Sequence, residues 1–293
     1  MGLKSSANLH KTNWKAWLKR LCAPLAISGM VLLCQNPADA SPQSLTFGIV
    51  PQQSASKLAR LWSPILRKLS QKSGYQLIFK TAPNIPIFEQ RLAEGQYDIA
   101  YMNPYHFTLY GQKPGYKAFA KAKNHHIRGI IVIRADSPIN QIEQLNNTTL
   151  AFPAPAAFAA SVLTRTHLMA QQIQFIPKYV SSHDSVYRTV AKGLYPAGGG
   201  IIRTFNNIEP GIRQQLKIFW TSQGYTPHAF AAHPRLPNDV IVKLQSAMTH
   251  FAQSPDQQFL LNKINLSGFA PALSSDWDDV RALNIPLLKP ESP

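Results

Sequence analysis

Cysteine is nearly absent from this sequence of 293 residues, and its two copies, Cys22 and Cys34, both lie within the first 40 residues. Residues 41–293 contain none, so we expect that part of the chain to fold without disulfides and to lack a cysteine nucleophile. A chain of this size can be stabilised by its hydrophobic core alone.

Acidic residues are scarce as well. The sequence has 14 Asp and Glu against 30 Lys and Arg, which gives a formal net charge of +16. The first 40 residues carry +4 of this charge, so the remainder carries +12. A strongly basic protein can attract anionic ligands, membranes or nucleic acids. The basic residues are scattered and never form a run of five, so we expect a solvated basic surface and no nucleic-acid partner.

A long apolar run is also missing. The stretch Leu21–Leu33 has roughly 13 residues, whereas a membrane-spanning helix needs about 20. It follows a basic leader and precedes Ala38-Asp39-Ala40, a small-x-small sequence. This order predicts a cleavable signal peptide over residues 1–40 and export to a Gram-negative periplasm, with an uncleaved N-terminal anchor as the alternative.

Catalytic signatures are missing too. The sequence has no G-x-S-x-G and no H-E-x-x-H, the motifs of serine hydrolases and zinc proteases. His125 and His126 are adjacent and cannot share one face of a helix or strand. The acidic residues Asp276, Asp278 and Asp279 fit a capped or solvated turn. We therefore expect no catalytic residues, no cofactor and no metal site.

Short apolar strands alternate with amphipathic helices in the rest of the chain. This alternation is typical of an α/β fold with a parallel sheet. The expected elements of a first lobe are strand Ser44–Val50, helix Ser56–Ser70, strand Tyr75–Lys80, helix Ile87–Glu94 and strand Tyr97–Tyr101. A second series runs from Pro138 to about Thr226, after the apolar strand Gly129–Arg134. The triplet Gly198-Gly199-Gly200 is expected to form a loop.

Several segments, taken in order, resemble the phosphate/phosphite/phosphonate substrate-binding family of ABC transporters. They include LTFGIVPQQS (45–54), LAEGQYDIAYMNPYHF (92–107) and VSSHDSVYRTVAKG (180–193). The resemblance spans nearly all of the chain after residue 40. It implies a two-lobed periplasmic-binding-protein fold of type 2, with the ligand held between lobes that are joined by a two-crossing hinge. The expected lobes are 41–134 with 228–293, and 135–227, with hinges near 134–138 and 221–226.

The site is expected at the carboxyl ends of the strands, where open α/β sheets bind ligands. The residues there that we expect to contact the ligand are Gln53, Ser54, Tyr101, Asn103, Tyr105, Ala157, Ser182 and His183. Backbone N–H groups at a helix start can hold an oxyanion there, together with side-chain donors. Arg203 is expected at the surface.

Two departures from the family pattern bear on the ligand. The stretch 152–159 is rich in Ala and Pro and lacks the family's hydroxyl donors, and Pro196 stands where the family has a carboxylate. The loss of that carboxylate argues against an aminated ligand. We expect a small anion of the phosphate, phosphite or phosphonate type, delivered by a monomeric protein to an inner-membrane ABC permease or a sensor. The alternatives are a less charged solute, a sensory or degenerate relative, and an exported enzyme of unfamiliar chemistry.

Overall fold

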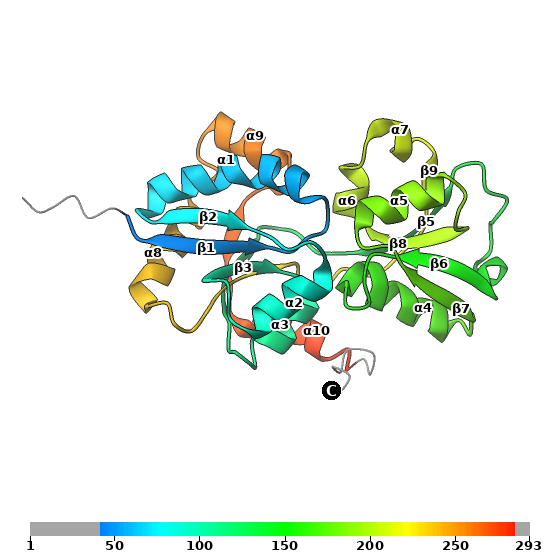
Figure 1. Cartoon of the computed structure of the whole chain (residues 1–293), viewed down its shortest axis with the longest axis horizontal. Coiled ribbons are helices and arrows are strands. Elements are labelled where there is room, and N and C mark those ends of the chain that lie inside the picture. Colours follow the sequence, from blue (N-terminus) through cyan, green and yellow to red (C-terminus); the bar gives the residue numbers. More distant parts are fainter. Residues whose placement is uncertain (1–41, 285–293) are drawn as a thin grey trace, which may run out of the picture. The chain divides into compact units, whose positions relative to one another are not determined.

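A computed structural model describes residues 42–284 of the chain. The expected signal peptide and both cysteines lie outside the described residues. Two separate sheets form the described part, in the strand orders β11-β4-β10-β3-β1-β2 and β7-β6-β8-β5-β9 (Figure 1). The α/β architecture expected from the sequence is thereby confirmed. Within 42–284, no helix is both long and apolar enough to cross a membrane.

The first sheet has a parallel half and an antiparallel half. Strands β1 (Ser44–Ile49), β2 (Gln76–Lys80) and β3 (Ile99–Met102) are parallel. Strand β10 (Ala229–Ala232) runs antiparallel to both β3 and β4 (Lys117–Ala122), and β11 (Phe269–Pro271) closes the edge. Its helices are α1 (Ala55–Ser73), α2 (Ile85–Ala93), α3 (Pro104–Tyr110), α8 (Asn238–Thr249), α9 (Pro255–Asn262), η3 (Ser274–Trp277) and α10 (Asp278–Arg281).

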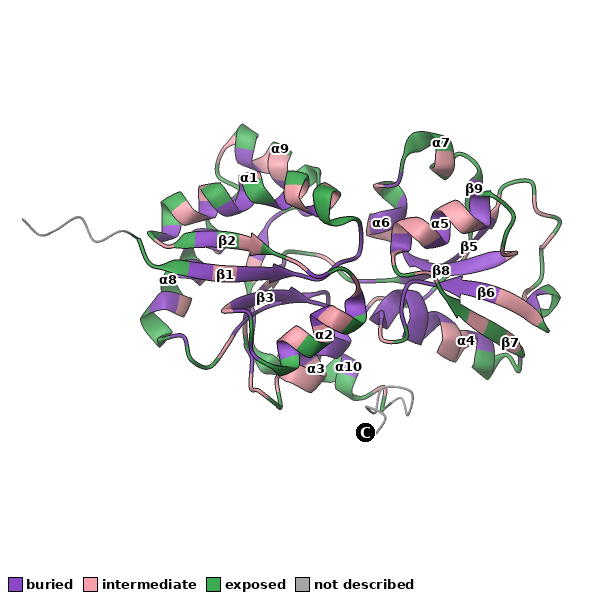
Figure 2. Cartoon of the chain, viewed as in Figure 1, coloured by how far each residue is buried: buried purple, intermediate pink, exposed green. Residues whose placement is uncertain are grey.

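The second sheet contains β5 (Gly129–Arg134), β6 (Thr148–Phe152), β7 (Phe175–Tyr179), β8 (Ala197–Ile201) and β9 (Leu216–Thr221). Its helices are η1 (Ile142–Leu145), the π-helical turn η2 (Phe158–Leu163), α4 (Thr164–Ala170), α5 (His183–Ala191), α6 (Ile202–Asn206) and α7 (Pro210–Arg213). The inner strands β3, β10, β5 and β8 are buried, whereas the edge strands β2, β7 and β9 and the outward faces of the covering helices are largely exposed or intermediate (Figure 2).

Helix α1 shows how local sequence sets these elements. It begins at the N-cap Ser54, whose hydroxyl accepts from the amide of Lys57, and ends at Gly74 in the left-handed conformation with φ 77°. Such a φ favours glycine at the end of a helix. Between these caps the apolar side chains recur at helical spacing and are buried, among them Trp62 and Leu66.

The glycine triplet is a strand, not the loop that the sequence suggests. Residues 198–200 lie in β8, where both faces are covered by helices. A Cβ on Gly198 would lie 2.4 Å from Cγ1 of Val186 in α5, and one on Gly199 would lie 1.9 Å from the carbonyl oxygen of Ala160 in η2. Only glycine lets two helices approach a strand this closely.

Strand β5 also differs from its expected place. It pairs with β8 and β9, so it belongs to the second sheet and not to the first lobe. The first crossing between the sheets therefore precedes Gly129, whereas the sequence suggested 134–138. The return crossing runs between the end of β9 and the start of β10, over residues 222–228.

Candidate functional site

A small cavity lies where the two sheets face each other. Its lining comes from both lobes: Val50, Gln52, Ile85 and Asn103 from the first, Ala157, Phe158, Ala159, Ala160, His183 and Ile201 from the second, and Ile127 and His228 from the two crossings. Its volume is about 10 Å³, room for about one water molecule. We call it the interlobe cavity. The two lobes are therefore closed on each other in this conformation.

The start of η2 supplies backbone donors to this cavity. The amides of Ser161 and Val162 both donate to the carbonyl of Ala157, at 2.7 and 3.3 Å. The amides of residues 158–160 precede these bonds and so have no acceptor within the helix. The partial positive charge of a helix start adds to these N–H groups. Three consecutive residues with unpaired backbone donors thus line the cavity.

Two glycines let η2 lie this close to the sheet. A Cβ on Gly129 would lie 2.2 Å from the carbonyl oxygen of Ala159, and one on Gly199 would lie 1.9 Å from that of Ala160. The backbone of η2 therefore packs directly on the surface of β5 and β8. The small side chains of Ala159 and Ala160 leave the backbone, and not hydroxyl groups, as the source of donors.

His183 is the first residue of α5, behind the N-cap Ser182, whose hydroxyl accepts from the amide of Ser185 at 3.1 Å. The His183 ring is buried, and its Nδ1 lies 3.2 Å from the Thr204 hydroxyl. Burial, and next the charge of Arg203, lower the pKa of His183 to about 3. The imidazole is therefore neutral at pH 7, and its Nε2 is the ring nitrogen left for the cavity.

Gln52 connects the two lobes. Its carbonyl oxygen accepts from the amide of His183 at 3.2 Å, and its side-chain nitrogen lies 2.9 Å from Nε2 of His228. Its side-chain oxygen accepts from the guanidinium of Arg203. Burial, followed by the charge of Arg203, lowers the pKa of His228 well below its ordinary value. Both histidines of the cavity are thus neutral.

Asn103 also reaches across the lobes. Its side-chain oxygen caps α3 by accepting from the amide of His106 at 2.7 Å, and its nitrogen donates to the carbonyl of Ala156 at 3.1 Å. A carboxamide has both a donor and an acceptor, so one side chain fixes the helix and the second lobe together. Asn103 lies at the carboxyl end of β3, where the sequence placed it.

A polar contact outside the cavity joins the starts of α1 and α5. The side chain of Gln53 donates to the carboxylate of Asp184 at 3.2 Å, and Nζ of Lys57 lies 3.6 Å from that carboxylate. Lys57 also donates to the carbonyl of Asn207 at 2.6 Å. We call the contact of Gln53, Lys57 and Asp184 the lobe latch.

The structure distributes the eight expected site residues over several different places. The lining of the interlobe cavity includes Asn103, Ala157 and His183. Gln53 lies in the lobe latch, while Ser54 and Ser182 cap helices. Tyr101 lines the neighbouring pocket described below, and Tyr105 lies buried in α3, where burial raises its pKa.

Three polar residues of this region carry no clear signal in the sequence. Nothing in the sequence distinguishes Gln52 from its neighbour Gln53, and His228 is an isolated histidine before β10. Arg203, expected at the surface, is half-buried and lies over the ring of Tyr101, with 5.7 Å from its guanidinium carbon to the ring centroid. Their partners are more than a hundred residues away in sequence, so only the fold reveals them.

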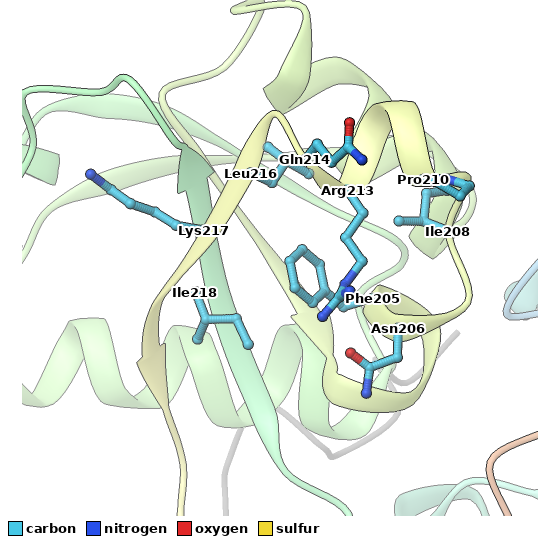
Figure 3. A pocket seen from close by; sticks show the side chains of 9 residues that line it. All are labelled: Phe205, Asn206, Ile208, Pro210, Arg213, Gln214, Leu216, Lys217 and Ile218. Atoms are coloured by element: carbon cyan, nitrogen blue, oxygen red, sulfur yellow. The ribbon is translucent and has the colours of Figure 1, made fainter.

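A wider depression of about 410 Å³ lies on the second lobe alone (Figure 3). Figure 3 shows the side chain of Arg213 beside the ring of Phe205, with 5.4 Å from the guanidinium carbon to the ring centroid. No residue of the first lobe lines it. Within residues 42–284, no group of three His, Asp or Glu side chains is placed to hold a metal ion.

Comparison with known proteins identifies the family. Residues 47–277 match the family described as "ABC transporter, phosphonate, periplasmic substrate-binding protein". A relative from Mycolicibacterium smegmatis, "Phosphate-import protein PhnD", is 21% identical over 87% of this chain and 89% of its own length.

Solved structures show the same fold. A binding protein component of an ABC phosphonate transporter from Pseudomonas aeruginosa has a TM-score of 0.76 and 18% identity, over 83% of this chain and 86% of its own. PhnD1 from Prochlorococcus marinus, solved with methylphosphonate, has a TM-score of 0.74 and 18% identity, over 83% of this chain and 99% of its own. The fold is that of two-lobed periplasmic binding proteins of type 2. The family match spans most of the chain, which therefore belongs to the periplasmic phosphonate substrate-binding proteins of ABC transporters.

Proposed function

We propose that the protein is the exported binding component of an ABC importer and that it captures a phosphorus oxyanion between its lobes. The observation that carries the ligand class is the start of η2, where unpaired amides of residues 158–160 line the interlobe cavity together with His183. Relatives that import phosphate or bind methylphosphonate support the same class.

The lining of the cavity suits an anion that carries no amine. Its polar side chains are Gln52, Asn103, His183 and His228, and none of its residues is Asp or Glu. An ammonium group would have no carboxylate to pair with there, and burying an unpaired charge is costly. Backbone N–H groups and a neutral imidazole, by contrast, donate to anionic oxygens. The protein acts in this proposal by binding alone, without catalysis.

Ligand entry requires the lobes to separate, because the cavity of about 10 Å³ is too small for a phosphonate. The crossings at 123–128 and 222–228 are the natural hinges for such a motion. The contacts that must break include the lobe latch, the hydrogen bonds of Gln52 to His183 and Arg203, and the bond from Asn103 to Ala156. A closed, latched form is the one that a permease would recognise as loaded.

The ligand class is tested by thermal unfolding of residues 41–293 with phosphate, phosphite, methylphosphonate, sulfate, an amino acid and an uncharged solute. Binding at a hundredfold excess over the dissociation constant stabilises a protein by about 2.7 kcal/mol. We expect a rise in melting temperature with phosphorus oxyanions. A rise with the uncharged solute alone would replace this proposal with the less charged ligand, and no rise at all would favour a degenerate relative.

Export is tested separately. The full chain, expressed in a Gram-negative host, should appear in the periplasmic fraction with an intact mass that begins at Ser41. A protein that keeps residues 1–40 and sediments with membranes would instead be anchored.

A further inference from the structure

A second and larger cavity adjoins the interlobe cavity. Its volume is about 190 Å³, and Ile127, Ile201 and His228 line both spaces. Its other walls include Tyr101 and two arginines, Arg128 and Arg203. We call it the arginine pocket. A space that shares three residues with the interlobe cavity can hold another part of the same ligand.

The charges in the arginine pocket are of one sign. Arg128 and Arg203 line it together with His125 and His126, and no Asp or Glu does. Neither arginine belongs to any ion pair recorded between residues 42 and 284. Two guanidinium groups therefore share a concave space without an anionic partner.

Each guanidinium uses only part of its hydrogen-bonding capacity. Arg128 donates from one nitrogen to the carbonyl of Ser222 at 2.9 Å. Arg203 donates to the side-chain oxygen of Gln52 and lies over the ring of Tyr101. A guanidinium has five N–H donors in a planar fork that matches a carboxylate or phosphate. Both arginines thus keep donors for an anionic group.

The histidines around the pocket report the same uncompensated charge. The positive charge of Arg203 lowers the pKa of His125, His183 and His228, in each case after the larger effect of burial. His125 lines the arginine pocket, His183 lines the interlobe cavity and His228 lines both. The electrostatic field of one guanidinium therefore reaches both cavities. No acidic side chain that lines either cavity offsets it.

A purely structural role does not account for this arrangement. Closure of the lobes through Gln52 needs one neutral donor, which a carboxamide provides as well as a guanidinium. Two like charges that line one pocket repel each other and gain nothing for the fold without an anion between them. Arg128 is exposed, so packing does not explain its presence at the mouth either.

We propose that the arginine pocket binds a second anionic group of the ligand, so that the solute is a phosphonate or phosphate that also bears a carboxylate or another phosphate. This inference rests on the proposed function, because the interlobe cavity would hold the first phosphorus group. In this proposal half-buried Arg203, near the residues that line both cavities, binds the second anionic group from the interior, and exposed Arg128 binds it from the solvent side.

Calorimetry with matched ligands tests this. Methylphosphonate has one anionic group, while phosphonoacetate and 3-phosphonopropionate add a carboxylate at two distances. We expect at least one of these two to bind the wild-type protein about tenfold or more tightly than methylphosphonate, the gain of a charge-assisted hydrogen bond. In Arg128→Gln that gain should fall about tenfold, while methylphosphonate affinity changes less than threefold.

Arg213→Gln is the matched control, because it removes an arginine from the separate depression of the second lobe. It should leave all affinities unchanged. Acetate added with methylphosphonate tests for an independent anion, and a gain equal to that of the tethered carboxylate would overturn the single-ligand proposal. Equal affinities of all three ligands in the wild type would also overturn it, with the proposed function intact. If none of the three binds, this inference fails, and the proposed function fails with it if phosphate and phosphite do not bind either.

Discussion

Replacing Gly199 by alanine should displace the helix start that carries the proposed anion site. A Cβ at this position would lie 1.9 Å from the carbonyl oxygen of Ala160 and 2.8 Å from a ring carbon of Phe152. The first neighbour is backbone and cannot rotate away, so η2 must move off β8 by more than 1 Å. No left-handed φ is found at Gly199, so the cost arises from the contact and not from backbone strain.

The expected loss of stability is the overpacking cost of about 1–3 kcal/mol, reduced by the gain of about 0.4–1 kcal/mol from a less flexible unfolded chain. Urea unfolding followed by circular dichroism should therefore show the Gly199→Ala variant less stable by up to about 2.6 kcal/mol. Because the amides of residues 158–160 move with η2, calorimetry should show a loss of phosphonate affinity of tenfold or more.

Gly211→Ala is the matched control. A Cβ at Gly211 would meet nothing within 4 Å, and the residue lies inside helix α7. Alanine is a better helix former than glycine by about 1 kcal/mol, so this variant should be as stable as the wild type or more so, with unchanged affinity. If Gly199→Ala matched Gly211→Ala in both stability and affinity, the close packing of η2 on β8 would not be what positions the site.

Three further outcomes follow from the site. His183 has a pKa of about 3 in the folded protein and about 6.5 when unfolded. Because the unfolded state binds more protons between these two values, the contribution of His183 to the free energy of unfolding falls by about 2 kcal/mol from pH 7 to pH 5. In urea unfolding, the His183→Asn variant should lack this part of the pH dependence of stability. A pH dependence equal to that of the wild type would contradict the lowered pKa of His183. His183→Ala should weaken phosphonate binding by about 1.5–3 kcal/mol in calorimetry at pH 7, whereas a change below 0.5 kcal/mol would remove His183 from the site. Asp184→Ala breaks the lobe latch and should raise the ligand-free radius of gyration in small-angle scattering, while Asp136→Ala, which breaks a surface pair with Arg134, should not; equal radii for the two variants would show that the latch does not hold the lobes.

The sequence predicts the elements whose structure depends on near neighbours. Helix α1 follows from the spacing of residues such as Trp62 and Leu66 and from its cap at Ser54. Strand β8 could not be predicted in this way, because glycine is unfavourable in strands in general. Glycine suits strand β8 because Ala160 and Val186 pack closely against it. These two residues lie on helices whose position against β8 no local sequence pattern predicts.

The same limit explains which site residues could be expected. The rule that ligands bind beyond the carboxyl ends of strands leads to Asn103, Ala157 and His183, and the structure places all three in the lining of the interlobe cavity. Arg203 escapes that rule, since it follows β8 in α6 and contacts Gln52 and Tyr101 of the other lobe. Its burial depends on lobe closure, which is a property of the whole fold.

The alanine-rich start of η2 and the charge of Arg203 together determine the electrostatics of the interlobe cavity. Alanines at η2 remove hydroxyl donors and let the helix backbone approach, while burial, and next the charge of Arg203, keep the cavity histidines neutral. A bound anion would offset that charge and raise the pKa of His183 and His228. Ligand binding and proton uptake therefore favour each other, so affinity should rise as the pH falls toward the raised pKa values of these histidines in the ligand-bound protein.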